Sequence, residues 1–238
     1  MCRMLGVASR NPFPVSRWLL GEPRGLLHLS LHGKRAPHRD GLGYAYLDGD
    51  GRLHVRHWGK EELDWMLDGF PGEHSQLTSL LIAHARKASP EYRARLTADQ
   101  AHPFLEGGLA LAHNGGIRDA ERLDPGPGID SQRLARWLAR AWQPRTREVL
   151  LEALEELLAT VRDYTAINLL FTDGKSLYAF RRCTEKPDYY SLWFQVSPGL
   201  VLVASEPLGD EGWQPLADGE LLAIAPDLSL SHHRIPLP

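Results

Sequence analysis

The chain has 238 residues, of which 43% are hydrophobic and 24% are charged, and its formal net charge at pH 7 is -3. This composition is typical of a globular protein with a sizeable core, and it lacks the basic excess expected of a nucleic-acid-binding protein. The sequence contains no apolar run long enough for a membrane span and no N-terminal signal peptide. We therefore expect a cytoplasmic protein in which Cys2 and Cys183 are free thiols.

Apolar segments in the first half of the chain predict strands. Residues 43–47 and 53–58 flank the turn sequence Asp-Gly-Asp-Gly and predict a β-hairpin. Residues 80–84 and 109–113 are apolar runs of the length of a buried strand, and each ends in a histidine that is followed by polar residues.

The middle of the chain predicts two helices. The first begins with Asp130-Ser131 as a cap and is ended by Pro144, and the second runs from Thr146 to about Asp163 with leucines at helical spacing. The order of strands, two helices and more strands predicts an α+β fold. Because no linker or repeat divides the chain, we expect one domain over residues 1–238. The later strands are predicted at residues 167–171, 177–181, 192–196, 200–204 and 221–225.

Cys2 offers a nucleophile beside its own base. Removal of Met1 is favoured when the second side chain is small, and it leaves the thiol next to an α-amine with an ordinary pKa of about 7.7–8.0. Part of this amine is neutral near pH 7 and can accept the thiol proton. Taken alone, however, Cys2 is more simply interpreted as an inert residue.

Two predicted strand ends carry polar groups suited to an amide substrate. Arg86 can bind a carboxylate through two parallel hydrogen bonds, although an ordinary surface arginine is the alternative. Asn114 and Gly115 provide two adjacent N–H donors of the kind found in an oxyanion hole, but Asn-Gly is also a common turn pair. By themselves, these residues leave both interpretations open.

Three further residues are candidates for substrate binding. Asp130 either holds an ammonium group or caps its helix, and His84 and His102 either line a pocket or shape the local backbone. A metal site is another use of histidine, but the chain has no His-Glu-x-x-His motif, and His54 and His57 would point to opposite faces of their strand. We therefore expect neither a metal nor a cofactor.

A series of motifs in chain order resembles the class II glutamine amidotransferases of the N-terminal nucleophile hydrolase superfamily. Residues 2–6 and a later segment that ends at Gly212-Trp213 are similar to its stand-alone branch, which includes the γ-glutamyl hydrolase of ergothioneine biosynthesis. The resemblance spans nearly the whole chain. Its motifs are Cys2, Asp40-Gly41, His84-Ala85-Arg86, His102-Pro103-Phe104, His113-Asn114-Gly115, Asp130-Ser131 and Ala204-Ser205-Glu206-Pro207-Leu208.

The resemblance implies a four-layer αββα sandwich and an acyl-enzyme mechanism. Cys2 would attack a γ-glutamyl carbonyl, while Asn114 and the Gly115 N–H would hold the oxyanion. Arg86 would bind the α-carboxylate of the γ-glutamyl group and Asp130 its α-amine, and His84 and His102 would shape the same site. This mechanism requires removal of Met1, which we expect in the mature protein.

Two departures from the family's pattern concern the side of the site that receives the leaving group. Gln100 stands where the branch usually has asparagine, and residues 87–95 are rich in arginine and lack a glycine that is often found there. The leaving group therefore stays open. Free glutamine, a γ-glutamyl dipeptide and a γ-glutamyl thiol-histidine derivative all share the half that the motifs recognise.

Two other functions also stay open. One is a glutaminase subunit that delivers ammonia to a separate synthetase, and the other is a non-catalytic subunit that uses the amidotransferase fold to bind glutamine or a partner protein. The intact set of site residues argues against the second. Neither nucleic acid nor a membrane is expected as a partner, and homo-oligomerisation is open.

Overall fold

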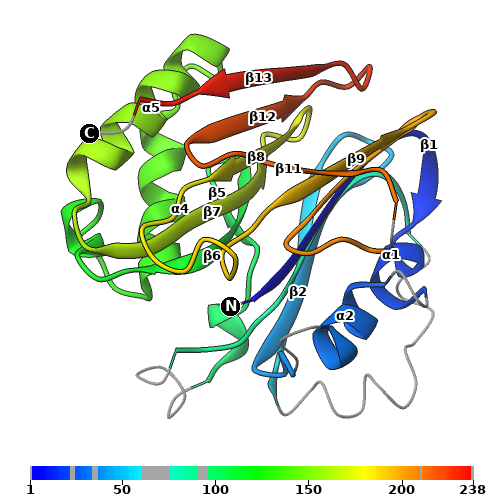
Figure 1. Ribbon diagram of the computed structural model, residues 1–238, viewed down its shortest axis with the longest axis horizontal. Helices are drawn as coiled ribbons and strands as arrows, with labels where there is room; N and C mark the ends of the chain where they lie inside the picture. Colours follow the sequence, from blue (N-terminus) through cyan, green and yellow to red (C-terminus); the bar gives the residue numbers. More distant parts are fainter. Residues whose placement is uncertain are drawn as a thin grey trace.

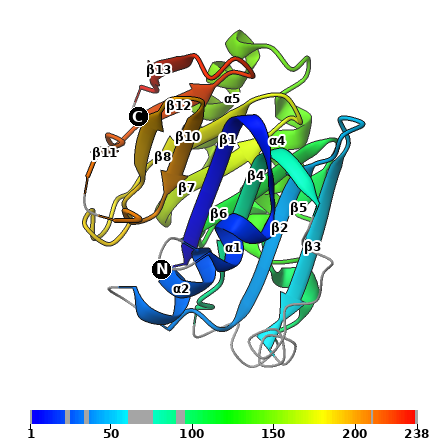
Figure 2. The ribbon, with the colours of Figure 1, turned by 90° about the vertical axis from the view of Figure 1, so that its right-hand side faces the viewer.

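Two antiparallel sheets lie face to face, and helices cover both outer faces (Figures 1 and 2). The computed structural model describes residues 2–21, 25–33, 37–60, 76–89, 96–209 and 211–236. The first sheet has the order β11 (Trp213–Pro215), β9 (Trp193–Ser197), β10 (Leu200–Ala204), β1 (Arg3–Pro14), β4 (Leu77–Ala85), β2 (Gly41–Leu47) and β3 (Leu53–Gly59). The second has the order β13 (Leu230–Arg234), β12 (Glu220–Ile224), β8 (Leu177–Arg181), β7 (Tyr164–Thr172), β6 (Leu109–Ile117) and β5 (Phe104–Glu106).

Three apolar clusters hold these layers together. Helices α1 (Ser16–Leu20) and α2 (Leu26–His32) pack on the outer face of the first sheet, and α4 (Asp130–Ala141) and α5 (Arg147–Thr160) pack on that of the second. The third cluster lies between the sheets. The fold is therefore the α+β, αββα sandwich that the sequence predicts.

The long segments with clear patterns form the elements that were expected of them. The hairpin pairs β2 with β3, with Leu47 opposite Leu53, and the Asp48 carboxylate accepts hydrogen bonds from the backbone N–H groups of Asp50 and Arg52 inside the turn. Strands β8 and β10 have the predicted bounds, and the other predicted strands differ from theirs by a few residues at the ends.

Helix α5 ends earlier than predicted, at Thr160 instead of about Asp163. Val161 has extended backbone angles, and the next two residues turn away because the Asp119 carboxylate accepts hydrogen bonds from the backbone N–H groups of Arg162 and Asp163, at 2.9 and 3.3 Å. A side chain far along the sequence therefore sets the end of this helix.

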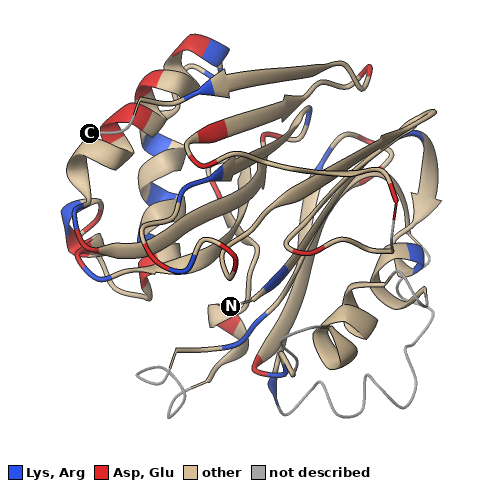
Figure 3. Cartoon of the chain, in the orientation of Figure 1, with Lys and Arg blue, Asp and Glu red and all other residues tan. Residues whose placement is uncertain are grey.

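No helix in the described part of the chain has the length and apolarity needed to cross a membrane. The outer helices α4 and α5 carry basic and acidic residues close together (Figure 3). On α4, Arg136 and Arg140 both form ion pairs with Asp124, at 3.1 and 2.8 Å. This mixed surface is consistent with the small net charge of the sequence.

Strand β1 was not predicted, although it is the longest strand and lies in the middle of its sheet. It pairs with β10 on one side and β4 on the other. Its side chains point alternately into two cores. Met4 packs between the sheets, and Leu5 packs beneath α1 and α2. Because the first half of the strand, Arg3–Ala8, is buried on both faces, its sequence does not show the polar alternation that reveals a half-exposed strand.

The start of β1 is held by the segment that follows β10. The Met4 N–H donates to Ser205 Oγ at 3.0 Å, and the Ser205 N–H donates to the Met4 carbonyl at 3.1 Å. Arg3 is fully buried, and its Nη2 lies 2.6 Å from Glu206 Oε2. Two distant segments of the family resemblance, residues 2–6 and 204–208, are therefore in direct contact.

We expect Glu206→Ala to lower the free energy of unfolding by about 3–5 kcal/mol, because it leaves the buried Arg3 guanidinium without its counter-charge. Urea unfolding followed by circular dichroism measures this change. The control is Glu185→Ala, which removes an exposed partner of Arg118 and should cost less than about 1 kcal/mol. Equal effects of the two substitutions would contradict a structural role for the buried pair.

Candidate active site

A cavity of about 500 Å³ opens beside the start of β1, where the first residues of the chain meet β6. In Figure 1 the start of β1 lies close to β6. Both sheets and the start of α4 contribute to the wall. The lining residues include Cys2, Arg86, Lys87, His102, His113, Gly115, Gly116, Arg118, Asp130, Ser131, Thr165 and Tyr190.

Cys2 is held by contacts on both its backbone and its thiol. Its N–H donates to Asn114 Oδ1 at 3.0 Å, and its Sγ lies 3.4 Å from the Lys87 N–H and 3.8 Å from the Lys87 carbonyl oxygen. Burial raises the pKa of the thiol, and the Lys87 N–H and the Arg86 charge only partly oppose this. A thiol in this state needs a base before it can attack a carbonyl.

Asn114 and Gly115 lie inside β6, so the turn interpretation of this pair is wrong. Asn114 Oδ1 faces the Cys2 nitrogen, and the buried Nδ2 donates to none of the described residues. A Cβ atom at Gly115 would lie 1.8 Å from the Ala166 carbonyl oxygen, so only glycine fits at this position. The pair therefore offers N–H donors on a rigid strand next to the thiol.

Arg86 follows β4 and is buried, with an exposed fraction of 3%. Its Nη1 donates to Gln100 Oε1 at 3.2 Å, so the glutamine that departs from the family's pattern contacts the arginine directly. The Asp40-Gly41 motif holds the same segment, because the Arg86 N–H donates to the Gly41 carbonyl at 2.7 Å and the Ala88 N–H donates to Asp40 Oδ2 at 2.9 Å.

Asp130 is the first residue of α4, and its N-cap is Ile129, so the prediction that Asp130 itself caps the helix is wrong. The reason is that Gln132 Oε1 accepts the hydrogen bond from the Ile129 N–H. This leaves the Asp130 carboxylate to accept from the N–H groups of Ile117 and Ser131, at 2.9 and 2.8 Å. The carboxylate is thereby fixed at the cavity wall with acceptor capacity left over.

Ser131 was noted in the sequence only as part of a cap, yet it connects two site residues. Its hydroxyl lies 2.8 Å from His113 Nδ1 and 3.2 Å from Asp130 Oδ1. The other ring nitrogen of His113 lies 3.1 Å from the Ala166 carbonyl oxygen, to which it donates. Burial lowers the pKa of His113, while the Asp130 charge opposes this.

His102 lines the cavity, whereas His84 is fully buried and packs behind it, with ring centroids 4.2 Å apart. Burial lowers the pKa of both rings well below the ordinary value, and the charge of Arg86 acts in the same direction. Both histidines are therefore neutral at pH 7. Within the described residues, no group of three histidine, cysteine, aspartate or glutamate side chains is arranged to hold a metal ion.

The predicted catalytic and binding residues are thus gathered around one cavity, with His84 in a supporting position behind His102. Thr165 and Tyr190 were not predicted as site residues. Gln100 and residues 87–95 were expected on the side that receives the leaving group, but Gln100 contacts Arg86, the residue expected to bind the γ-glutamyl carboxylate. Residues 90–95 of the arginine-rich segment lie outside the described part of the chain, as does Met1.

A family model described as class II glutamine amidotransferases matches residues 1–196. The chain belongs to this family. A search of curated proteins finds an uncharacterized protein of Methanocaldococcus jannaschii that is 26% identical over 181 residues, which are 62% of this chain and 50% of that protein. No finding places the chain in the ergothioneine branch, so that finer assignment stays a prediction.

Three solved structures share the fold. Glutamine phosphoribosylpyrophosphate amidotransferase from B. subtilis, complexed with ADP and GMP, superimposes with a TM-score of 0.70 at 19% identity over 100% of this chain and 50% of its own. A glutamine aminotransferase class-II domain protein from Silicibacter pomeroyi gives 0.66 at 17% identity, covering 99% and 100%. A predicted glutamine amidotransferase from Pseudomonas aeruginosa gives 0.57 at 20% identity, covering 94% and 98%. The chain therefore spans about half the length of the B. subtilis enzyme and of the Methanocaldococcus protein.

The buried histidines around the site predict that acid destabilises the fold. Burial, with the Arg3 charge, lowers the pKa of His38 to about 4, whereas its value in the unfolded chain is near 6.5. Between these values only the unfolded chain takes up the proton, so stability falls as the pH drops from 6.5 towards 4, by roughly 3 kcal/mol from this residue alone. Urea unfolding at about pH 7.5, 6 and 5 covers this window and measures how steeply stability falls with pH. In His38→Gln the slope should be shallower, and an unchanged slope would show that His38 is not responsible.

Proposed function

We propose that the protein hydrolyses a γ-glutamyl amide through Cys2, which becomes the N-terminal residue when Met1 is removed. The observation that supports this most directly is that Cys2, Arg86, Gly115 and Asp130 all line one cavity. These groups match the substrate in chemistry, since a cation faces its carboxylate, an anion faces its ammonium group, and N–H donors face the carbonyl to be attacked.

The reaction begins with transfer of the thiol proton to the α-amine of Cys2. The thiolate sulfur then forms a bond to the γ-carbonyl carbon, and the carbonyl electron pair moves onto oxygen, where Asn114 Nδ2 and the Gly115 N–H stabilise the negative charge. Collapse of this intermediate breaks the C–N bond, and the amine departs with the proton held by the α-ammonium group. Water then cleaves the thioester by the same route and releases glutamate.

The amine is well placed for this work, because the Cys2 nitrogen already lies 3.0 Å from Asn114 Oδ1. In the mature chain the same contact would orient the α-amine and keep Asn114 Nδ2 directed away from it, towards the oxyanion. One asparagine would thus serve the base through its oxygen and the oxyanion through its nitrogen.

Delivery of ammonia to a synthetase is the alternative function for the same chemistry. The two functions differ in their kinetics. A free hydrolase turns over alone, whereas an ammonia donor is slow until its partner is added. A non-catalytic binding subunit would retain the fold without a reactive thiol. The labelling experiment that follows tests the binding subunit, and the rate at which the protein alone hydrolyses glutamine tests ammonia delivery.

Treatment with 6-diazo-5-oxo-norleucine, a reactive glutamine analogue, should modify Cys2 with one adduct per chain. The physical reason is that Arg86 and Asp130 hold the analogue's carboxylate and amine, so that the thiol attacks the diazomethyl carbon next to the ketone and N2 is released. Intact-mass measurement checks the removal of Met1, and peptide mapping identifies the modified residue. Cys183→Ala is the matched control and should be labelled like the wild type, whereas Cys2→Ala should not be labelled. Retention of Met1, or an adduct on Cys183 only, would refute the proposed nucleophile.

Arg86→Met should lower kcat/KM for glutamine by roughly 10- to 100-fold, because charge-assisted hydrogen bonds to the α-carboxylate are lost. Comparison with 4-aminobutyramide, which is glutamine without this carboxylate, separates recognition from folding. The substitution should leave the slow hydrolysis of that amide nearly unchanged. If both amides lose activity equally, Arg86 acts on the structure of the site and not on the carboxylate.

A further inference from the structure

Strand β6 divides the cavity into two sides. On one side it pairs with β5, with Phe104 opposite Leu111, and His102 and the Arg86–Gln100 contact lie on this side. On the other side it pairs with β7, with Gly115 opposite Ile167, and Thr165 and Tyr190 line the wall there. If the substrate carbonyl sits at the middle strand, the γ-glutamyl chain and the leaving amine extend in different directions from it, because both are bonded to the same carbon.

We propose that Tyr190 determines specificity for the leaving group, and that Arg181 is the residue that positions it. The inference rests on the proposed function, because the γ-glutamyl half is assigned to the side of Arg86. The amine that departs then lies against Thr165 and Tyr190. The ring of Tyr190 selects an amine that carries a planar or apolar substituent.

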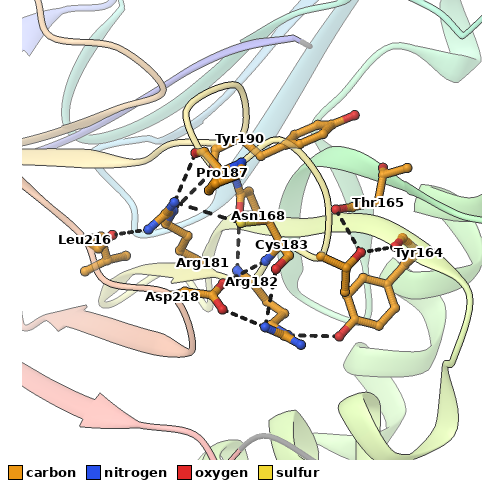
Figure 4. Close-up of polar contacts among 11 residues, drawn as sticks. Tyr164, Thr165, Asn168, Arg181, Arg182, Cys183, Pro187, Tyr190, Leu216 and Asp218 are labelled. Carbon is orange, nitrogen blue, oxygen red and sulfur yellow. Dashed lines mark hydrogen bonds and ion pairs between the residues drawn. The ribbon is translucent and has the colours of Figure 1, made fainter.

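The segment between β8 and β9 carries Tyr190 and is held by Arg181 at the end of β8. The Arg181 guanidinium donates to the carbonyl oxygens of Tyr190, Pro187 and Leu216, at 3.1, 3.1 and 3.0 Å. Figure 4 shows these contacts, with the Tyr190 ring extending away from the guanidinium. The Arg181 side chain therefore fixes the backbone of Tyr190 to the end of β8 without contacting the Tyr190 ring.

Two further features fix the shape of this segment. Lys186 has a φ of 48°, in the left-handed region that is uncommon for residues other than glycine, and its carbonyl accepts from the N–H groups of Tyr189 and Tyr190 at 2.7 and 3.0 Å. At the other end, Ser191 Oγ donates to the Ser205 carbonyl at 3.0 Å. Ser205 is also the partner of Met4, so Tyr190 and Cys2 are attached to the same part of the first sheet.

The size of the cavity agrees with a substrate larger than glutamine. Its volume of about 500 Å³ falls in the range of about 300–1,000 Å³ that holds drug-sized ligands. On the β7 side, Arg118 already pairs with Asp163 at 2.5 Å and with Glu185 at 3.5 Å, so its charge is largely balanced. The Tyr190 ring forms part of the wall there, and an aromatic surface favours contact with a flat group.

The test compares hydrolysis of γ-glutamyl-p-nitroanilide, whose leaving amine is aromatic, with hydrolysis of glutamine, whose leaving group is ammonia. In Tyr190→Ala, kcat/KM for the anilide should fall about tenfold relative to that for glutamine, because a ring contact is lost. Tyr190→Phe, which keeps the ring, should retain the wild-type ratio. The rate at which the diazo-ketone analogue labels Cys2 should be the same in all three proteins.

Arg181→Met should shift the same ratio in the same direction, and the double variant with Tyr190→Ala should be no more impaired than Tyr190→Ala alone, since both act through one ring. The matched control is Arg182→Met. Arg182 is the next residue along, but its guanidinium contacts Tyr164 and Asp218. This control should keep the wild-type ratio, and melting temperatures identify any variant that loses activity by unfolding.

The outcomes separate the two proposals. A wild-type protein that is not labelled at Cys2 and hydrolyses neither amide refutes the proposed function and the inference with it. A wild-type protein that is labelled and active, combined with an unchanged ratio in Tyr190→Ala, refutes only the role of Tyr190. Additive effects of the Arg181 and Tyr190 substitutions would refute the positioning role of Arg181.

Discussion

The site depends on holding the beginning of a chain still, which is physically demanding because chain ends fray unless they are tied down. Here the first strand lies between two others, and its pairing with β4 begins at Arg3. The buried ion pair of Arg3 with Glu206 adds an electrostatic contact that is broken only at a large desolvation cost. The position of Cys2 thus depends on contacts of β1 with residues about two hundred positions away.

Close backbone approach is the second constraint, and glycine permits it at two places. A Cβ at Gly115 would collide with the Ala166 carbonyl, and one at Gly43 would lie 2.2 Å from the His102 carbonyl. The first contact lies within the second sheet, between β6 and β7. The second brings β2 of the first sheet against the loop before β5, so that the sheets meet at the end that carries the cavity. His102 can line the cavity because this loop lies directly on β2.

Much of the fold could be predicted because long apolar runs and helical leucine spacing report burial directly. Strand β1 could not, since it is buried on both faces and contains Gly6, Pro12 and Pro14. The order of strands within each sheet depends on pairing between segments that are far apart in the sequence, and local patterns do not reveal it. The family motifs identified most of the candidate site, but they could not show that Asp130 lies in the first turn after the cap.

For the same reason, the local sequence does not show which residues of different elements contact one another in the site. Ser131 between His113 and Asp130 has meaning only once β6 and α4 are packed together. Gln100 becomes a partner of Arg86 only when the segment before β5 folds over the end of β4. The choice between turn and strand at Asn114-Gly115 is also decided by tertiary pairing, because the neighbouring strand supplies the hydrogen bonds that an isolated turn would have to make itself.

The two sides of the cavity are built in different ways, and this has a consequence for specificity. On the β5 side, the Arg86 charge lies at the end of β4 beside Gln100, and the neutral histidines add no competing charge. The opposite charge, on Asp130, is fixed at the start of α4, where the carboxylate accepts from the Ile117 N–H. Such a surface suits a zwitterionic group and tolerates little change. On the β7 side, the wall is a turn held by one guanidinium. If the leaving amine lies against this turn, as proposed above, substitutions in the turn alter the choice of leaving group without disturbing Cys2. The substrate of a relative with a different turn is then a poor guide to the substrate of this protein.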